Sequence, residues 1–113
     1  TVIAFGTDFP VEEISPMMTF YSATVRKDKD GYPEDGFQTE NIMNRVDALK
    51  AMTIFGAFAN FEENEKGSIE VGKDADFIIL DNDILRSTES SIPNTNVVAT
   101  FINGELVFNR RYN

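Results

Sequence analysis

The residues best placed to do chemistry lie near the start of the chain, in the run Gly6-Thr7-Asp8. The preceding residues 2–5, Val-Ile-Ala-Phe, are apolar without alternation, a pattern typical of a strand buried on both faces. Asp8 would then follow the carboxyl end of that strand, where parallel α/β sheets and barrels carry their reactive groups. The alternative is that Asp8 only caps the turn into Pro10 and Val11.

Two neighbours of Asp8 are weaker candidates. Thr7 and Glu12 could orient Asp8 or contact a substrate, but a turn hydroxyl and a solvated acid are the simpler interpretation. A buried parallel strand also needs hydrogen-bonded neighbours, and no strand precedes this one in the sequence. We therefore expect the chain to be a piece of a larger protein.

The residue counts restrict the chemistry further. The 113 residues include no histidine and no cysteine. Histidine and cysteine are the usual zinc ligands, and they form the Ser-His and Cys-His nucleophile pairs. A hard cation could still bind through oxygen ligands. Taken alone, the chain is a poor candidate for an enzyme.

Charge and hydropathy bear on the partners. The net charge of −9 repels nucleic acid and anionic membranes, so neither is expected as a partner. No apolar run approaches the ~20 residues of a membrane span. The absence of cysteine fits a reducing compartment, and we expect a cytoplasmic protein.

The first part of the chain predicts helices. Ser15-Pro16 is typical of a helix start, and the apolar face that follows comprises Met17, Phe20, Tyr21, Thr24 and Val25. Residues 27–36 form a polar loop, either a mobile flap or a solvated surface loop. Asn44 and Asp47 resemble a capping box at the start of a second helix, which Gly56 would break or kink. A short helix is expected over 57–61, with Phe55, Phe58 and Phe61 in the core.

The pattern changes to β near Gly67. Extended segments are expected over 68–71, 75–80, 97–102 and 105–108, giving three or four antiparallel strands. Asn103-Gly104 between the last two predicts a hairpin with a type I′ turn.

Three segments together resemble the carboxyl-terminal part of a metal-dependent amidohydrolase. They are Gly6-Thr7-Asp8, the helix end Ala48-Leu49-Lys50-Ala51-Met52-Thr53, and the run from Gly67 to Asp81 with its Gly72-Lys73-Asp74-Ala75-Asp76 turn. The closing segment, residues 97–108, is similar to the family's last hairpin. Residues 6–12 are most similar to the amidohydrolase-3 branch, which includes N-substituted formamide deformylases.

This resemblance implies an α/β fold: the last strand and helices of a (β/α)8 barrel, over residues 1–66, then antiparallel strands of a small composite β-sandwich, over 67–113. It also implies that Asp8 contacts a divalent metal, zinc by expectation, and takes a proton from the attacking water. Lys73, Asp74 and Asp76 would hold the sandwich turn. Phe55 stands where many relatives carry Asn, which puts that helix junction in doubt.

The leading hypothesis is therefore a hydrolase of non-peptide C–N bonds in small amide-type, N-acyl, formyl or cyclic substrates. A whole barrel takes ~250 residues, so this chain alone is expected to bind no metal and to be inactive. The alternative is a non-catalytic α+β module for binding or assembly. Exposed strand flanks also predict self-association, with residues 2–5 pairing across a dimer.

Overall fold

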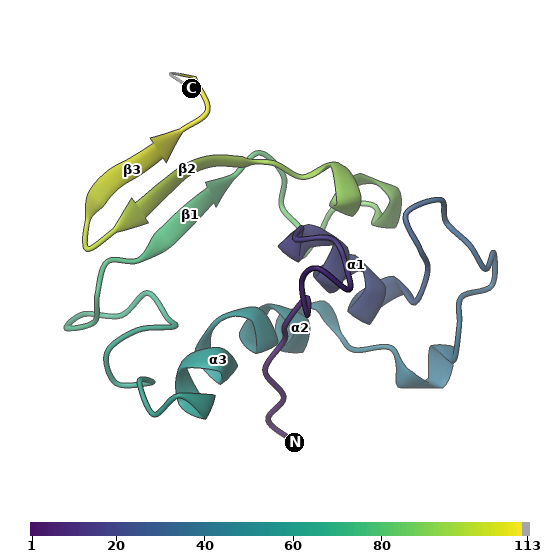
Figure 1. The fold of residues 1–113 in the computed structure, drawn as a ribbon, viewed down its shortest axis with the longest axis horizontal. Coiled ribbons are helices and arrows are strands. Elements are labelled where there is room, and N and C mark those ends of the chain that lie inside the picture. The colour runs from purple at the N-terminus through teal and green to yellow at the C-terminus, as the bar shows by residue number, and fades with distance from the viewer. Residues whose placement is uncertain (112–113) are drawn as a thin grey trace.

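A computed structural model describes residues 1–111 of the chain. Its helices are α1 (Pro16–Val25), α2 (Arg45–Met52) and α3 (Ile54–Ala59), with 3₁₀ turns η1 (Thr39–Asn41) and η2 (Glu89–Asn94). Its strands are β1 (Phe77–Leu80), β2 (Val97–Ile102) and β3 (Glu105–Asn109). The fold is thus a small α/β arrangement in which the helices come first and a three-stranded antiparallel sheet follows (Figure 1).

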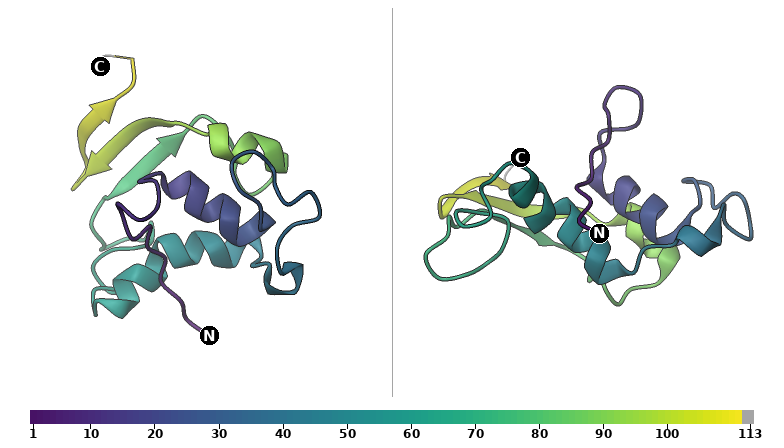
Figure 2. Two further views of the ribbon diagram at one scale, coloured as in Figure 1. Left: turned by 45° about the vertical axis from the view of Figure 1, so that its right-hand side comes forward. Right: turned by 90° about the horizontal axis from the view of Figure 1, so that it is seen from below.

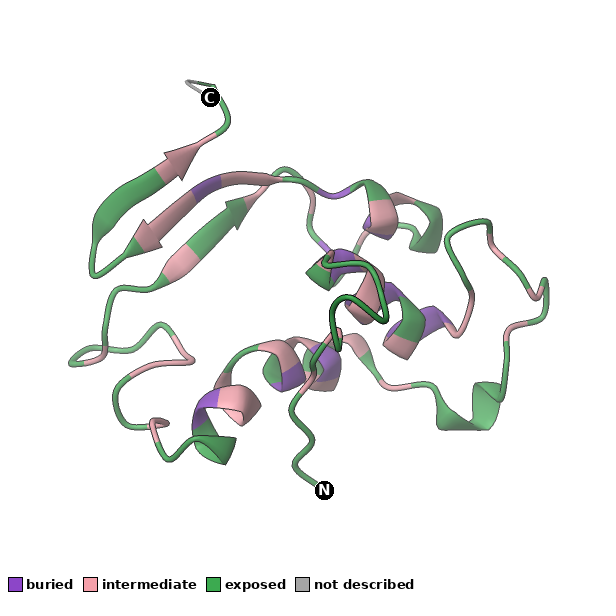
Figure 3. Ribbon diagram, in the orientation of Figure 1, coloured by how far each residue is buried: buried purple, intermediate pink, exposed green. Residues whose placement is uncertain are grey.

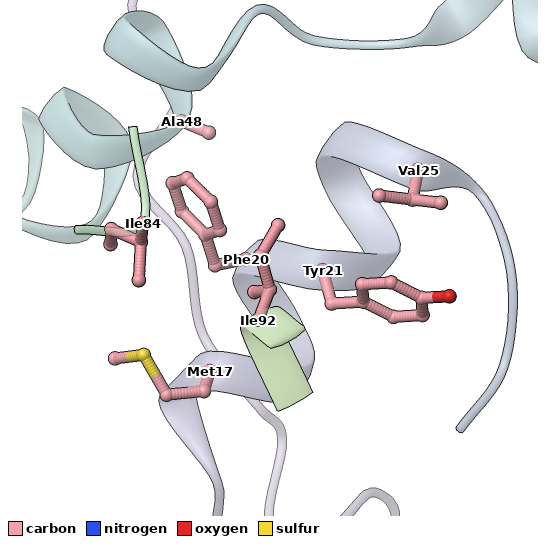
Figure 4. Close-up of a cluster of buried hydrophobic side chains, with 7 residues drawn as sticks. All are labelled: Met17, Phe20, Tyr21, Val25, Ala48, Ile84 and Ile92. Carbon is pink, nitrogen blue, oxygen red and sulfur yellow. The ribbon is translucent and has the colours of Figure 1, made fainter. Parts of the chain in front are cut away.

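The core forms around α1, as its apolar spacing predicts. All five residues of the expected face are buried in the structure. Phe20 is fully enclosed, and Ala48 of α2, Ile84 and Ile92 close over it (Figure 4). The Thr24 hydroxyl donates to the Phe20 carbonyl oxygen at 2.8 Å, so this buried polar group is satisfied. Figure 3 shows the buried residues gathered in α1, α2 and η2.

The helix caps follow the sequence in part. Asn44 caps α2: its side-chain oxygen accepts the Asp47 N–H at 2.9 Å, and its amide donates to the Asp47 carboxylate. Ser15 stands at the N-cap of α1, but its side chain makes no capping hydrogen bond. The break between α2 and α3 falls at Thr53 rather than at Gly56, which lies inside α3.

The sheet is an antiparallel meander with β2 in the centre. Phe77 and Phe101 face each other across β1 and β2, and their rings stack with centroids 4.6 Å apart. Asn103 and Gly104 both have positive φ, at 50° and 78°, which confirms the type I′ turn between β2 and β3. Residues 68–71 form no strand, so the sheet has three strands.

Two of the burial predictions are wrong for this structure. Residues 2–5 form no strand, and Val2 and Ile3 are 51% and 48% exposed. A strand exists only through a ladder of partners, and here the Phe5 N–H makes one backbone bond, to the Ala51 carbonyl oxygen at 3.0 Å. Phe58 and Phe61 are 52% and 92% exposed, because no part of the chain within residues 1–111 covers that side of α3.

The two expected sections, 1–66 and 67–113, share one hydrophobic cluster. Ile84 and Ile92 from the second section pack against α1 and α2 from the first. The Arg45 guanidinium donates to the carbonyl oxygens of Ile84 and Ser87, at 3.1 and 2.7 Å. Leu80 at the end of β1 also packs against the cluster, and the rest of the sheet extends away from it (Figure 1). The boundary at residue 67 stays a prediction.

No helix within residues 1–111 is long and apolar enough to cross a membrane.

Candidate functional site

Asp8 lies in an exposed turn between the N-terminal segment and α1. The Val11 N–H donates to the Asp8 backbone carbonyl oxygen at 2.8 Å, which closes the turn through the main chain. Within residues 1–111 the Asp8 carboxylate makes no hydrogen bond, so it does not cap the turn as the alternative interpretation required. Its φ of 51° lies in the left-handed region, where Asp and Asn are several times commoner than most other non-glycine residues.

The turn that carries Asp8 projects from the helices (Figure 2, right). Phe9 and Val11, which flank it, are 62% and 75% exposed. The Asp8 carboxylate is therefore presented on a surface segment rather than at the base of a pocket of this chain. Glu12 and Thr7 make no side-chain contact with it that the described residues record.

The resemblance assigned Lys73, Asp74 and Asp76 to holding a turn, and the contacts are of that kind. The Lys73 ammonium donates to the Ser68 hydroxyl at 2.6 Å and lies 3.4 Å from the Glu70 carboxylate. The Asp76 carboxylate accepts the Asn103 N–H at 2.8 Å, which fixes the β2–β3 turn from outside. These residues join neighbouring loops and leave no shared opening for a ligand.

The loop over residues 27–37 is closed by its own hydrogen bonds. At its base Phe37 N–H donates to the Arg26 carbonyl oxygen at 2.8 Å, and the Arg26 side chain returns a bond to the Phe37 carbonyl oxygen at 2.9 Å. Inside the loop Asp28 accepts the N–H groups of Asp30 and Tyr32, both at 2.9 Å. This bonding favours the surface-loop interpretation over the mobile flap.

Two open cavities flank this loop, and sequence reasoning did not find them. One, of about 450 Å³, lies between the start of α1, the loop tip and η2, with Glu13, Tyr21, Lys29, Asp30, Ser90 and Asn94 in its lining. The other, of about 530 Å³, lies between Glu12, the outer side of α1 and residues 26–33 and 37. Both are assembled from segments far apart in sequence, so no local pattern could have indicated them.

A metal centre does not form from the described residues alone. Residues 1–111 contain no group of three or more Asp, Glu, His or Cys side chains that could hold a metal ion. Asp8 offers one carboxylate, and the sequence has no histidine or cysteine to complete a site. The residues present therefore do not fit the metal implied by the resemblance, and no catalytic step can be derived through it here.

Comparison with known proteins defines the class of protein. The Amidohydrolase family model called Amidohydro_3 matches residues 1–108, and the chain belongs to this family. The fold agrees: an amidohydrolase from Thermotoga maritima MSB8 superposes with a TM-score of 0.66 and 26% identity. That match covers 97% of this chain and 24% of the other.

Two relatives carry named activities. An N-substituted formamide deformylase of Arthrobacter pascens is 28% identical over 108 residues, 96% of this chain and 19% of that enzyme. A 5-methylthioadenosine/S-adenosylhomocysteine deaminase of Caldanaerobacter subterraneus is 31% identical, over 96% of this chain and 26% of that enzyme. The chain thus spans about a fifth to a quarter of the length of the relatives it matches.

Proposed function

We propose that the chain supplies the carboxyl-terminal part of a metal-dependent hydrolase that cleaves non-peptide C–N bonds in small amide, N-acyl, formyl or cyclic amide compounds. Residues 1–66 would complete a (β/α)8 barrel, and residues 67–113 a composite β-sandwich. Family membership over residues 1–108 supports the hydrolase class. The printed names of two relatives, a deformylase and a deaminase, support chemistry at C–N bonds.

The observation that carries the proposal is the free carboxylate of Asp8 in the run Gly6-Thr7-Asp8. A carboxylate with no partner can accept a proton from a water molecule as that water attacks the carbonyl carbon of an amide. The left-handed backbone at Asp8 is a conformation that concentrates at functional sites. Asp8 is accordingly the catalytic residue and the single metal contact that this chain would contribute.

The other ligands would lie outside this chain. The divalent metal, which we expect to be zinc, would be held by residues of the remaining four-fifths of the protein. Purified by itself, the chain should bind no stoichiometric zinc and hydrolyse no amide. Either result, metal at one equivalent by mass spectrometry or measurable turnover, would contradict the division of labour proposed here.

Asp8→Asn in the full-length protein tests the catalytic role. Asparagine keeps the size of the side chain but accepts protons poorly, so kcat should fall by roughly 10²–10⁴-fold. Glu12→Gln removes a charge four residues away and should retain most of the activity. Circular dichroism of each variant checks that the fold is intact, and an active, folded Asp8→Asn enzyme would refute the role.

The alternative, a non-catalytic module for binding or assembly, is favoured by one observation. Ile78, Ile79, Leu106 and Val107 of the sheet are each about half exposed, at 46–54%. The coding sequence upstream of Thr1 separates the two: a His-x-His motif after a strand supports the enzyme, and an immediate start codon supports the module.

A further inference from the structure

The cavity between α1, the tip of the 27–37 loop and η2 has a floor formed by one buried polar side chain. Tyr21 is 5% exposed, and its ring belongs to the hydrophobic cluster. Its hydroxyl points away from that cluster (Figure 4), and Tyr21 lines the cavity of about 450 Å³. No hydrogen bond to this hydroxyl is found within residues 1–111, although buried polar groups are almost always paired.

The electrostatic potential at this floor is negative. Burial raises the pKa of Tyr21 above its ordinary value, and the nearby carboxylates of Glu89 and Asp28 raise it further. Glu13 and Asp30 add two more carboxylates at the cavity wall. Lys29 is the one cation in the lining, and the surrounding acids outnumber it. A cationic guest is therefore favoured over an anionic one.

The chain already places an ammonium group beside this cavity. The Lys29 side-chain nitrogen lies 3.8 Å from the Glu13 carboxylate. Both side chains are about two-thirds exposed, so this ion pair is weak and readily exchanged. The apolar parts of Met18 and Pro93 also line the cavity, which gives an alkyl group a surface to pack against.

We propose that this cavity binds a small primary ammonium compound, whose N–H groups donate to the Tyr21 hydroxyl oxygen and to the carboxylates of Glu13 and Asp30. The alkyl part packs on Met18 and Pro93, and the ligand replaces the Lys29 ammonium as the partner of Glu13. Binding here is independent of the hydrolytic function proposed above, because the test measures binding by the 113-residue chain itself.

The test is a titration of the isotope-labelled chain with butylammonium chloride, followed by NMR. Shifts of the Tyr21 ring and of residues 29–31 and 90–94 should saturate with a dissociation constant on the order of 1 mM. Sodium chloride at equal ionic strength should leave them unchanged. Tetramethylammonium, which has no N–H donor, should bind several-fold more weakly.

Three matched pairs of variants sharpen the test. Tyr21→Phe and Asp30→Asn should each weaken binding by roughly fivefold, whereas Tyr32→Phe and Asp35→Asn, changes in the same loop but outside this cavity, should not. Lys29→Met should bind roughly threefold more tightly, because the internal ammonium is gone. Lys27→Met, which borders only the second cavity, is its control.

Four outcomes would overturn the proposal. They are no saturable shift, equal binding of tetramethylammonium, an equal response to magnesium chloride, and variants that change binding no more than their controls. If Tyr21→Phe fails to fold, Asp30→Asn and Lys29→Met still decide the question, since their side chains lie on the exposed loop and have opposite expected effects.

Discussion

The carboxylates of Asp81 and Asp8 show what surroundings do to one residue type. Asp81 accepts the Asn96 backbone N–H at 2.8 Å and the Asn96 side-chain amide at 2.9 Å, and Arg110 lies 3.3 Å away. The two bonds from Asn96, with a smaller contribution from Arg110, lower the pKa of Asp81 below its ordinary value. Asp81 thus clips the loop over residues 81–96 at its base, whereas Asp8 stays free to act as a base.

A pH dependence of stability follows from Asp81. Because its pKa is lower in the folded state, its ionised form stabilises the fold above the ordinary value of 3.8, and this contribution is lost as the pH falls through the folded value. Asp81→Asn should lower Tm at neutral pH and flatten its decline on the acid side. Thermal unfolding across that range measures this.

The slope will not vanish in the Asp81 variant. Hydrogen bonds also lower the pKa values of Glu62 and Glu70, so both act in the same direction. Asp35→Asn, an exposed loop change, serves as the control. A variant with the same pH profile as the parent chain would show that the Asn96 bonds do not persist in solution.

Sequence reasoning at this scale could identify Asp8 but not Tyr21. Asp8 stands in a short run whose members are adjacent in sequence, so its motif can be read directly. The Tyr21 hydroxyl matters only because residues 29–30 and 90–94 fold around it. Spacing within a helix indicates which face is buried, but not what lies at the end of a side chain.

Among the elements, α2 depends on its cap. Asn44 satisfies the Asp47 N–H and also bonds the Asp47 carboxylate. Asn44→Ala should therefore cost about 1 kcal/mol of unfolding free energy. Urea unfolding of Asn44→Ala against Asn64→Ala, an exposed turn position, measures this difference. Equal midpoints would mean that α2 does not need its cap.

The contact between α3 and the start of the β section depends on a glycine. Gly67 has φ of +89°, and a Cβ there would lie 2.8 Å from the Ala57 Cβ and 2.9 Å from the Ile54 Cα. Gly72 has a similar φ of +94° but open space around it. Both Ala substitutions incur the left-handed penalty, and only Gly67→Ala also displaces the helix.

Gly67→Ala should thus be less stable than Gly72→Ala by roughly 1–3 kcal/mol. Chemical denaturation of the two variants gives the difference directly. If the two lose equal stability, α3 does not pack against residue 67 in solution.

The elements predicted well are those specified by neighbouring residues. Ser15-Pro16, Asn44 with Asp47, and Asn103-Gly104 each determine a local conformation, and the helix starts and the hairpin appear where they indicate. Residues 2–5 and Phe58 failed for a shared reason. Apolar runs indicate that a surface should be covered, but the covering groups must come from elsewhere.

At the scale of the whole molecule, uncovered apolar surface predicts self-association. Val2 and Ile3 are about half exposed, and the outer edges of β1 and β3 are unpaired within residues 1–111. We expect a concentration-dependent dimer in sedimentation velocity, with residues 2–5 pairing between copies. Ile3→Lys should weaken it, and Ile69→Lys, at another exposed site, should not. A monomer at high concentration would contradict this expectation.

The bonds from Arg45 to Ile84 and Ser87 have a consequence for a severed chain. They span 39 and 42 residues, and they join the same two sections that the Ile84 and Ile92 packing joins. Neither section holds a complete core, so the peptides 1–66 and 67–113 made separately should each stay unfolded. Mixed together, they should reassemble into one folded particle, which makes the exposed loop near Gly67 a natural place to divide this protein into a complementing pair.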